Sequence, residues 1–174
     1  MNVIEPASSG RSKGRGCKQN IAKGDLPFGE QLPNPFADGD MTLWFHLLCA
    51  AYRRPEPLHD LLSESPPEDG ECSENLTELC RIGIEAPRLQ RIAEAELAPS
   101  GRTRCRHRKE AIEKATWRLR LEYFEEGAFN PSGNIHLGCS TVFLTTTDTV
   151  MARVIHFTTE LTDTQAKEIK EALQ

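Results

Sequence analysis

SGRSKGRGCKQNIAKG, at residues 9–24, recurs as SGRTRCRHRKEAIEKA at residues 100–115. Besides the opening Ser-Gly-Arg, the two stretches share four positions at an offset of about ninety residues: Arg15 with Arg106, Lys18 with Lys109, Ile21 with Ile112 and Lys23 with Lys114. Farther along the chain, His46-Leu-Leu-Cys49 is matched by His136-Leu-Gly-Cys139. Self-similarity at a fixed offset is the signature of an internal duplication. The sequence therefore predicts two copies of one small unit.

The length of 174 residues accommodates two such units and a connector. We expect the first unit at residues 1–62, an acidic linker with short helices at 63–93, and the second unit with a C-terminal helix at 94–174. Units of roughly 60 to 75 residues seldom build a sufficient core alone and usually need a metal, disulfides or a partner. The few aromatic residues agree with thin cores.

The N-terminal sequence lacks an apolar signal core, and the longest apolar run, residues 43–51, is too short for a bilayer span. We therefore expect a cytoplasmic protein that does not enter membranes. In a reducing compartment, six cysteines favour metal ligands or free thiols over disulfides. Cys72 and Cys80 have no counterpart in the other copy, so we interpret them as thiols of the linker and of helix packing.

The expected fold class is small α+β, with short antiparallel strands and short helices. In the first half we expect extended chain over 1–8, turns over 9–24, loop with at most short strands over 25–40, a helix over 43–52, and a helix over 74–82 that is capped by Ser73 and stopped by Gly83. In the second half we expect a short helix from Pro87 to about Ala93, a strand over 117–124, a turn over 125–134, a helix over 136–144, a helix over 149–157 capped by Asp148, and a last helix over 163–173 that begins with the capping box Thr162–Gln165.

Thiolate and imidazole groups at these spacings predict metal sites. Zinc prefers four such ligands in a tetrahedron, usually a C-x-x-C knuckle followed by a later pair on a helix. Each copy here keeps the later pair and one knuckle cysteine, which gives Cys17, His46 and Cys49 in the first copy and Cys105, His136 and Cys139 in the second. We expect up to two Zn²⁺ sites. A single His-x-x-Cys on an apolar helix is ordinarily core, and it is the matched repetition that favours ligands.

These motifs resemble poly(ADP-ribose) polymerase-type (PARP-type) zinc fingers, in particular the small bacterial proteins made of two such fingers. The resemblance rests on SGRSKGRGCKQNIAKGDLPFG with WFHLLC, and on SGRTRCRHRKEAIEKATWRL with FEEGAFNPSGNIHLGC. It covers residues 3–60 and 94–160, and it implies zinc binding and recognition of DNA, typically at breaks or ends. No segment outside these regions is left for the family's catalytic domain.

Two departures from that pattern affect the predicted sites. Gly14 and Arg108 stand where the family has cysteines. Three outcomes remain open: a water or a neighbouring group such as His107 completes each site, or the zinc is lost and packing alone holds the unit, or the copy folds poorly. Loss of one thiolate removes a substantial part of the roughly 10–16 kcal/mol that structural zinc contributes in finger peptides.

The charge distribution matters more than the net charge of −5. Cations cluster in both repeats and acids cluster in the connector, so we expect the repeats to contact DNA phosphates without reading sequence. The predicted contact residues are Arg11, Lys13, Arg15, Lys18, Arg102, Arg104, Arg106, Arg108 and Lys109. Trp44, Phe45 and Trp117 are expected mainly in the cores, with exposed apolar surface as their alternative role.

The predicted function is a non-catalytic zinc-finger protein that binds DNA backbone, including breaks or ends. One alternative is a protein-interaction module that keeps the fold without DNA binding, which the acidic connector and the net charge favour. The other is an enzyme that uses zinc with an open coordination position, for which the sequence offers no convincing general base.

Overall fold

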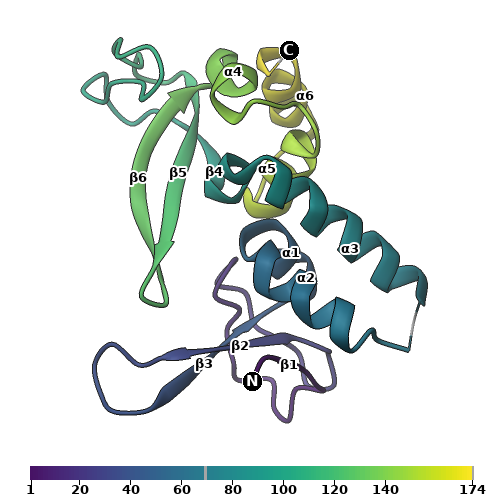
Figure 1. Cartoon of the computed structure of the whole chain (residues 1–174). Coiled ribbons are helices and arrows are strands. Elements are labelled where there is room, and N and C mark those ends of the chain that lie inside the picture. Colours follow the sequence, from purple (N-terminus) through teal and green to yellow (C-terminus); the bar gives the residue numbers. More distant parts are fainter. Residues whose placement is uncertain (69, 174) are drawn as a thin grey trace. The chain divides into compact units, whose positions relative to one another are not determined.

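The computed structural model describes residues 1–68 and 70–173, without the side chains of residues 70–72. The chain divides into two compact units, Met1–Glu85 with Glu125–Ala128 and Ala86–Phe124 with Phe129–Gln174. The described residues form small three-stranded sheets and short helices, which is an α+β architecture (Figure 1). No helix among them combines the length and the apolar character that a bilayer span requires.

The first unit contains a sheet in the order β1-β2-β3, formed by Val3–Ile4, Phe28–Pro33 and Asp40–Phe45. Both pairings are antiparallel, and Phe28 lies opposite Phe45 with ring centroids 6.3 Å apart. Three helices follow: α1 (Leu47–Arg53), α2 (Pro55–Glu64) and α3 (Gly70–Glu85). They pack on one another (Figure 1), and an ion pair between Arg54 and the buried Glu30 ties the start of α2 to β2.

The second unit repeats this plan. Its sheet has the order β4-β5-β6, formed by Ile92–Leu97, Trp117–Glu125 and Ala128–His136. The helical elements are η1 (Pro87–Arg91), η2 (Leu137–Cys139), α4 (Ser140–Leu144), α5 (Val150–Phe157) and α6 (Asp163–Ala172). Helix α5 packs on β4, and the backbone N–H of Ala95 donates to the Thr158 hydroxyl at 3.0 Å. Strand β3 ends directly before His46, and strand β6 ends at His136.

Several local predictions are confirmed. The alternating segment 117–124 is strand β5, the helix over 149–157 is α5, and Thr162 with Gln165 forms the capping box of α6. Residues 9–24 contain turns, and their only described ladder contact is an isolated bridge between Lys13 and Asn20.

Other local predictions are wrong where strand pairing overrides the pattern of the sequence. Residues 43–45 belong to β3, and the helix begins only after His46, because Leu43 and Phe45 point into the core from a strand that pairs with β2. The prediction for residues 25–40 agrees with the structure, since they are loop apart from the short strand β2 and Asp40 of β3. Residues 92–93 begin β4 rather than ending a helix, and residues 128–134 belong to β6 rather than to a turn.

Two predicted helix N-caps and one predicted helix stop are wrong as well. Helix α3 begins at Gly70 and continues through Gly83 to Glu85, so Ser73 lies within the helix instead of capping it. Packing of α3 against α1 and α2 outweighs the modest cost of a helical glycine. The N-cap of α5 is Thr149 and not Asp148, and no side chain caps that helix.

Candidate metal centres

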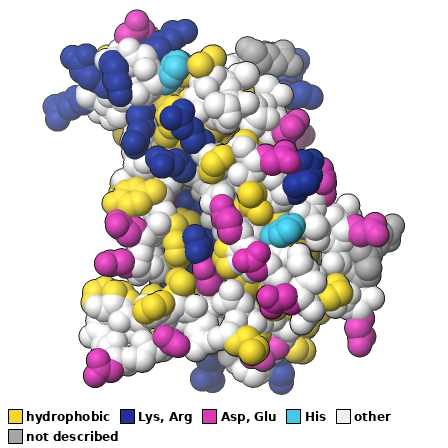
Figure 2. Space-filling view, in the orientation of Figure 1, with side chains coloured by type: hydrophobic (Ala, Val, Ile, Leu, Met, Phe, Trp, Pro, Cys, Tyr) yellow, Lys and Arg dark blue, Asp and Glu magenta, His cyan; other side chains and the backbone are white. Residues whose placement is uncertain are grey.

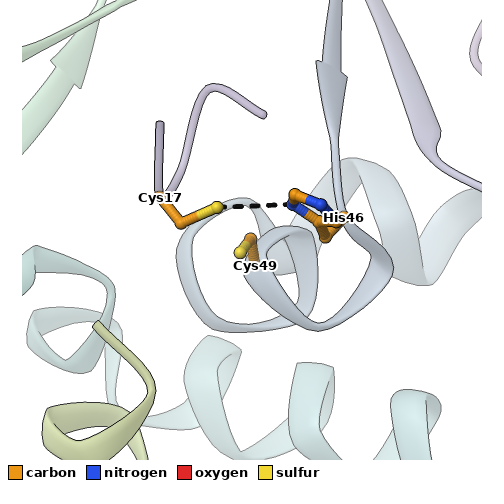
Figure 3. Close-up of side chains that lie close together, drawn as sticks. All are labelled: Cys17, His46 and Cys49. Atoms are coloured by element: carbon orange, nitrogen blue, oxygen red, sulfur yellow. Dashed lines mark hydrogen bonds between the residues drawn. The ribbon is translucent and has the colours of Figure 1, made fainter. Parts of the chain in front are cut away.

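The first centre brings together Cys17, His46 and Cys49 (Figure 3). Cys17 lies in a turn within the basic stretch of residues 9–24, His46 directly follows β3, and Cys49 lies in the first turn of α1. The three ligand atoms lie within 4.8 Å of one another, and the Cys17 sulfur is 3.3 Å from Nδ1 of His46. This group can hold a metal ion.

The orientation of the His46 ring is fixed from its far side. Nε2 lies 3.2 Å from the backbone carbonyl of Asn20, so Nε2 carries the proton and donates it. Nδ1 is then left with its lone pair facing Cys17 and Cys49. A hydrogen bond on the remote nitrogen is the usual arrangement around histidines that bind metals, because it sets the tautomer and the ring angle.

Burial strongly affects the Cys49 thiol. Cys49 is fully buried, and this burial, with the neighbouring Cys17, raises the pKa of the thiol far above its usual range. Arg53 opposes the shift with a smaller effect. The thiol is therefore protonated in the absence of a metal, and metal binding must release this proton.

Gly14 lies directly against His46 and Cys17 in the first centre. A Cβ atom placed on Gly14 would lie 2.7 Å from Nδ1 of His46 and 3.5 Å from the Cys17 sulfur. Real Cβ atoms do not approach other atoms as closely as 2.7 Å, so a side chain at residue 14 would displace the imidazole. The absence of that side chain is what allows Cys17 and His46 to meet.

The second centre contains Cys105, His136 and Cys139, again with ligand atoms within 4.8 Å of one another. The two sulfurs are 3.8 Å apart, and the Cys139 sulfur is 4.0 Å from Nδ1 of His136. Nε2 of His136 lies 3.3 Å from the carbonyl of Ala111, which occupies the place of Asn20 in the repeat. The same tautomer is therefore fixed in both centres.

The backbone around the two centres is also duplicated. The matched hydrogen bonds run from Gly14 to Gln19 and from Cys105 to Glu110, from Lys18 to Gly14 and from Lys109 to Cys105, from Arg15 to Trp44 and from Arg106 to Asn134, and from Ile21 to Ser12 and from Ile112 to Thr103. Lys18 and Lys109 both adopt positive φ, at 61° and 66°. The repeat found in the sequence is thus a repeat of loop geometry.

The second centre differs from the first in its electrostatics. Burial raises the pKa of Cys105, but backbone N–H groups of Arg108, His136 and His107 outweigh it and lower the pKa from 9.0 to about 7. Burial and the neighbouring Cys105 raise the pKa of Cys139, while the charge of Arg108 opposes that rise. Arg108 therefore acts on both thiols, through its backbone N–H at Cys105 and through its positive charge at Cys139.

The other predicted candidates have clear positions. His107 is exposed and lies outside the group of three ligand atoms in the described structure. Cys80 is fully buried in α3, in agreement with a packing role, and the side chain of Cys72 lies outside the described residues. Phe45 is fully buried, whereas Trp44 and Trp117 are half-buried.

The cations of the two loops are exposed. All nine predicted DNA contacts have exposed side chains, and none of them has an ion-pair partner in the described part of the chain. Figure 2 shows Lys and Arg side chains gathered over the loop between β4 and β5. Two of the nine also make structural hydrogen bonds, from Arg104 to the carbonyl of Lys109 and from Arg106 to Ser132.

Arg118 and Arg120 follow the second repeat in the sequence and continue its run of cations, but they do not belong to this exposed set. Arg118 pairs with Glu96 and Arg120 with Glu94, across β4 and β5. Arg118 is buried, so these two cations are neutralised within the sheet. Arg118 and Arg120 therefore do not extend the exposed cations of the second loop into β5.

Phe36 is an exposed aromatic residue that the sequence interpretation missed. It stands at the tip between β2 and β3, in the sequence Asn-Pro-Phe-Ala-Asp-Gly, with 93% of its surface exposed. A large apolar residue flanked by turn-forming residues was the available signal. Because small domains rarely leave an aromatic side chain this exposed, Phe36 is a candidate contact residue.

Comparison with known proteins finds a partial similarity. No family model matches the chain. A segment of 47 residues is 48% identical to poly(ADP-ribose) polymerase 1 of Caenorhabditis elegans. That segment is 27% of this chain and only 5% of the other protein. The similarity is thus local, and it agrees with the family resemblance of the motifs without extending to the whole chain.

Substitution of Gly14 tests the geometry of the first centre. We expect Gly14→Ala to lower the free energy of unfolding by about 1–3 kcal/mol, because the new methyl group would overlap His46. Gly10→Ala is the matched control, since the nearest atom to its Cβ would be 3.8 Å away. Urea denaturation in the presence of a chelator measures both. Equal effects of the two substitutions would contradict the close approach at Gly14.

Proposed function

We propose that this chain is a zinc-binding DNA-binding module that acts without catalysis. The observation that carries the proposal is the repeated construction of one site, an exposed basic loop held against a Cys-His-Cys group. The local similarity to poly(ADP-ribose) polymerase 1 and the resemblance of both motifs to PARP-type fingers support it. The matched segment is too small a part of that polymerase to bring its activity to this chain.

Zinc fits the donor set and the spacing. Two thiolates and an imidazole are typical zinc ligands, and a tetrahedral ion with Zn–S bonds of about 2.3 Å needs sulfurs about 3.8 Å apart. The sulfurs of Cys105 and Cys139 are 3.8 Å apart. A sulfur and an imidazole nitrogen need a separation of about 3.6 Å on the same grounds. The values of 3.3 Å in the first centre and 4.0 Å in the second lie on either side of it.

Each centre then offers three ligands, and the fourth position falls to water or another small donor. In the first centre this position faces Gly14, where the contact with His46 is tight. In the second centre it faces the turn that carries Arg108. We infer weaker zinc binding than in a site with four protein ligands, because one strong thiolate bond is missing from each centre.

The basic loops supply the contact with DNA. Exposed lysines and arginines without carboxylate partners release counterions when they meet phosphates, and this release drives sequence-independent binding. If each loop neutralises about three phosphates, the logarithm of affinity falls with the logarithm of salt concentration with a slope near −5. Binding of this kind does not require a positive net charge, because the loops are local concentrations of cations.

Phe36 suggests a preference for interrupted duplexes. An aromatic side chain at the tip of a hairpin can stack on a base that has lost its neighbour, as at a nick or an end. An intact duplex offers no such base without the cost of unstacking. We therefore propose that breaks or ends are bound more tightly than continuous duplex.

A protein-interaction module is the second candidate function. Helices α2 and α3 carry many of the acidic residues of the first unit, and the net charge is −5, which opposes a general attraction to DNA. Under this alternative the protein binds a partner protein and does not bind nicked DNA in a gel-shift experiment.

Metal analysis tests the zinc sites. We expect protein purified without chelators to contain up to two zinc ions per chain. Arg108→Cys should tighten zinc binding by more than about tenfold. The new thiolate would bond to the metal directly, which contributes more than a change in the groups that surround the ligands. Gly14→Cys should gain less, because its Cβ must first displace His46. Competition with a chromophoric chelator measures these affinities. Cys80→Ser is a control outside both centres. The sites would be contradicted if purified protein contained no zinc and if Cys105→Ser left its metal binding unchanged.

A salt titration tests the loops. We expect Arg11→Gln combined with Arg102→Gln to reduce the magnitude of the salt slope by about 2, since two phosphate contacts are lost. These arginines occupy equivalent positions in the two loops. Lys167→Gln combined with Lys170→Gln removes two exposed cations from α6 and should leave the slope unchanged. Fluorescence anisotropy with a nicked duplex gives the measurement, and a wild-type slope near zero would refute phosphate binding.

Substitution of Phe36 tests the preference for breaks. We expect Phe36→Ala to weaken binding to a nicked duplex by about tenfold, because base stacking on an aromatic side chain contributes roughly 1–3 kcal/mol. Binding to the intact duplex should change little. Val142→Ala removes an apolar side chain that is 65% exposed and serves as the control. Equal losses on both duplexes would show that Phe36 does not read a break.

A further inference from the structure

A groove in the second unit lies next to the second metal centre and carries the opposite charge to the basic loop. It encloses about 790 Å³. Its lining includes three carboxylates and three large apolar side chains: Glu110, Glu113, Glu168, Leu97, Trp117 and Leu137. These residues come from β4, the loop after it, the start of β5, η2 and α6. His136 also lines the groove, and its Nε2–H already donates a hydrogen bond to the backbone carbonyl of Ala111.

The groove has the chemistry of a site for cations attached to an apolar body. Among the described residues that line it, none is Lys or Arg, although Lys114 is adjacent in sequence. Leu97 is 46% exposed and offers apolar contact. The indole N–H of Trp117 donates to the carboxylate of Glu168 at 3.0 Å, which fixes the ring and the charge together. Such a surface attracts lysine and arginine and repels phosphate.

The first unit serves as an internal comparison. At the matched positions of the repeat, Glu110 and Glu113 correspond to Gln19 and Ala22, and Trp117 corresponds to Leu26. The shared loop geometry therefore does not require these carboxylates or this indole. The acidic groove is a property of the second copy, added to a scaffold that the first copy builds without it.

We propose that this groove binds a basic segment of a partner protein. The segment places an aliphatic side chain against Leu97 and Trp117, while flanking lysine or arginine side chains meet Glu110 and Glu113. The charge of the groove carries this choice of partner, because a nucleic acid or an acidic peptide would be repelled. None of the cations proposed to bind DNA lines the groove, so the inference is tested independently of that function.

A defined peptide probe tests the groove. The probe is a fluorescein-labelled peptide of sequence Arg-Leu-Lys-Leu-Arg, with a second peptide in which glutamine replaces each cation. We expect the full chain to bind the basic peptide and not the glutamine peptide. Glu110→Gln combined with Glu113→Gln should weaken binding about fivefold, the effect of losing two exposed ion pairs. In ¹⁵N-labelled protein, the indole N–H resonance of Trp117 should shift on binding.

The matched control is Glu160→Gln combined with Glu171→Gln, which removes two exposed carboxylates outside the groove. It should leave peptide binding unchanged, and the groove variant should keep its affinity for nicked DNA. Equal weakening by both variants would mean non-specific charge attraction and would overturn the proposal. So would a groove variant that loses DNA binding, or a dimer in sedimentation that the groove variant dissociates, which would make a second copy the occupant.

Discussion

One backbone contact in each unit joins the turn that carries a cysteine to the strand that leads to the histidine. The N–H of Arg15 bonds to the carbonyl of Trp44 at 2.9 Å, and the N–H of Arg106 bonds to Asn134 at 2.8 Å. The loops contain little apolar surface, and each buries essentially one isoleucine, Ile21 or Ile112. Hydrophobic burial alone therefore stabilises them weakly, and the ligand groups and backbone bonds must hold them.

The two centres differ at two matched positions of the repeat, with Gly14 against Cys105 and Cys17 against Arg108, and the differences have distinct physical consequences. Gly14 leaves space that His46 occupies, so the first centre closes by a hydrogen bond between Cys17 and His46. Arg108 leaves a cation and a turn whose backbone N–H groups point at Cys105 and lower its pKa to about 7. The first centre holds its buried thiol Cys49 as a neutral group, whereas in the second centre the pKa of Cys105 is lowered and that of Cys139 is raised. The duplicated scaffold thus supports two electrostatically distinct sites.

The sequence predicted the repeated loops and their ligand groups because both depend on fixed spacing. Matched positions in two copies exclude chance more strongly than any single His-x-x-Cys could. Strand β3 was missed because Leu43 to Phe45 is apolar on both faces, which does not distinguish a short strand from a helix. Strand β6 was missed because Pro131 and Gly133 signal a turn, although an edge strand tolerates both. Both segments are strands because of the strands they pair with, and a local sequence pattern carries no information about those partners.

The surroundings of the other charged and aromatic residues were harder to predict than the two Cys-His-Cys groups. Arg118 and Arg120 belonged to the same basic run as Arg102, but the register of β4 against β5 places glutamates beside them. Phe36 was not singled out, because exposure depends on where a hairpin ends. A charged residue can therefore be assigned to the surface only after the pairing of its strand is known. Strand pairing likewise determines which charged residues belong to the basic loop and which to the acidic groove beside it.

X-ray absorption at the zinc edge tests the central claim most directly, because it reports the atoms around the metal and their distances. For protein loaded with zinc, the account predicts an average of two sulfurs at about 2.3 Å, one imidazole nitrogen at about 2.0–2.1 Å, and one further light atom per ion. A first shell of oxygen and nitrogen alone would contradict it, since the two Cys-His-Cys groups would then not be what holds the loops.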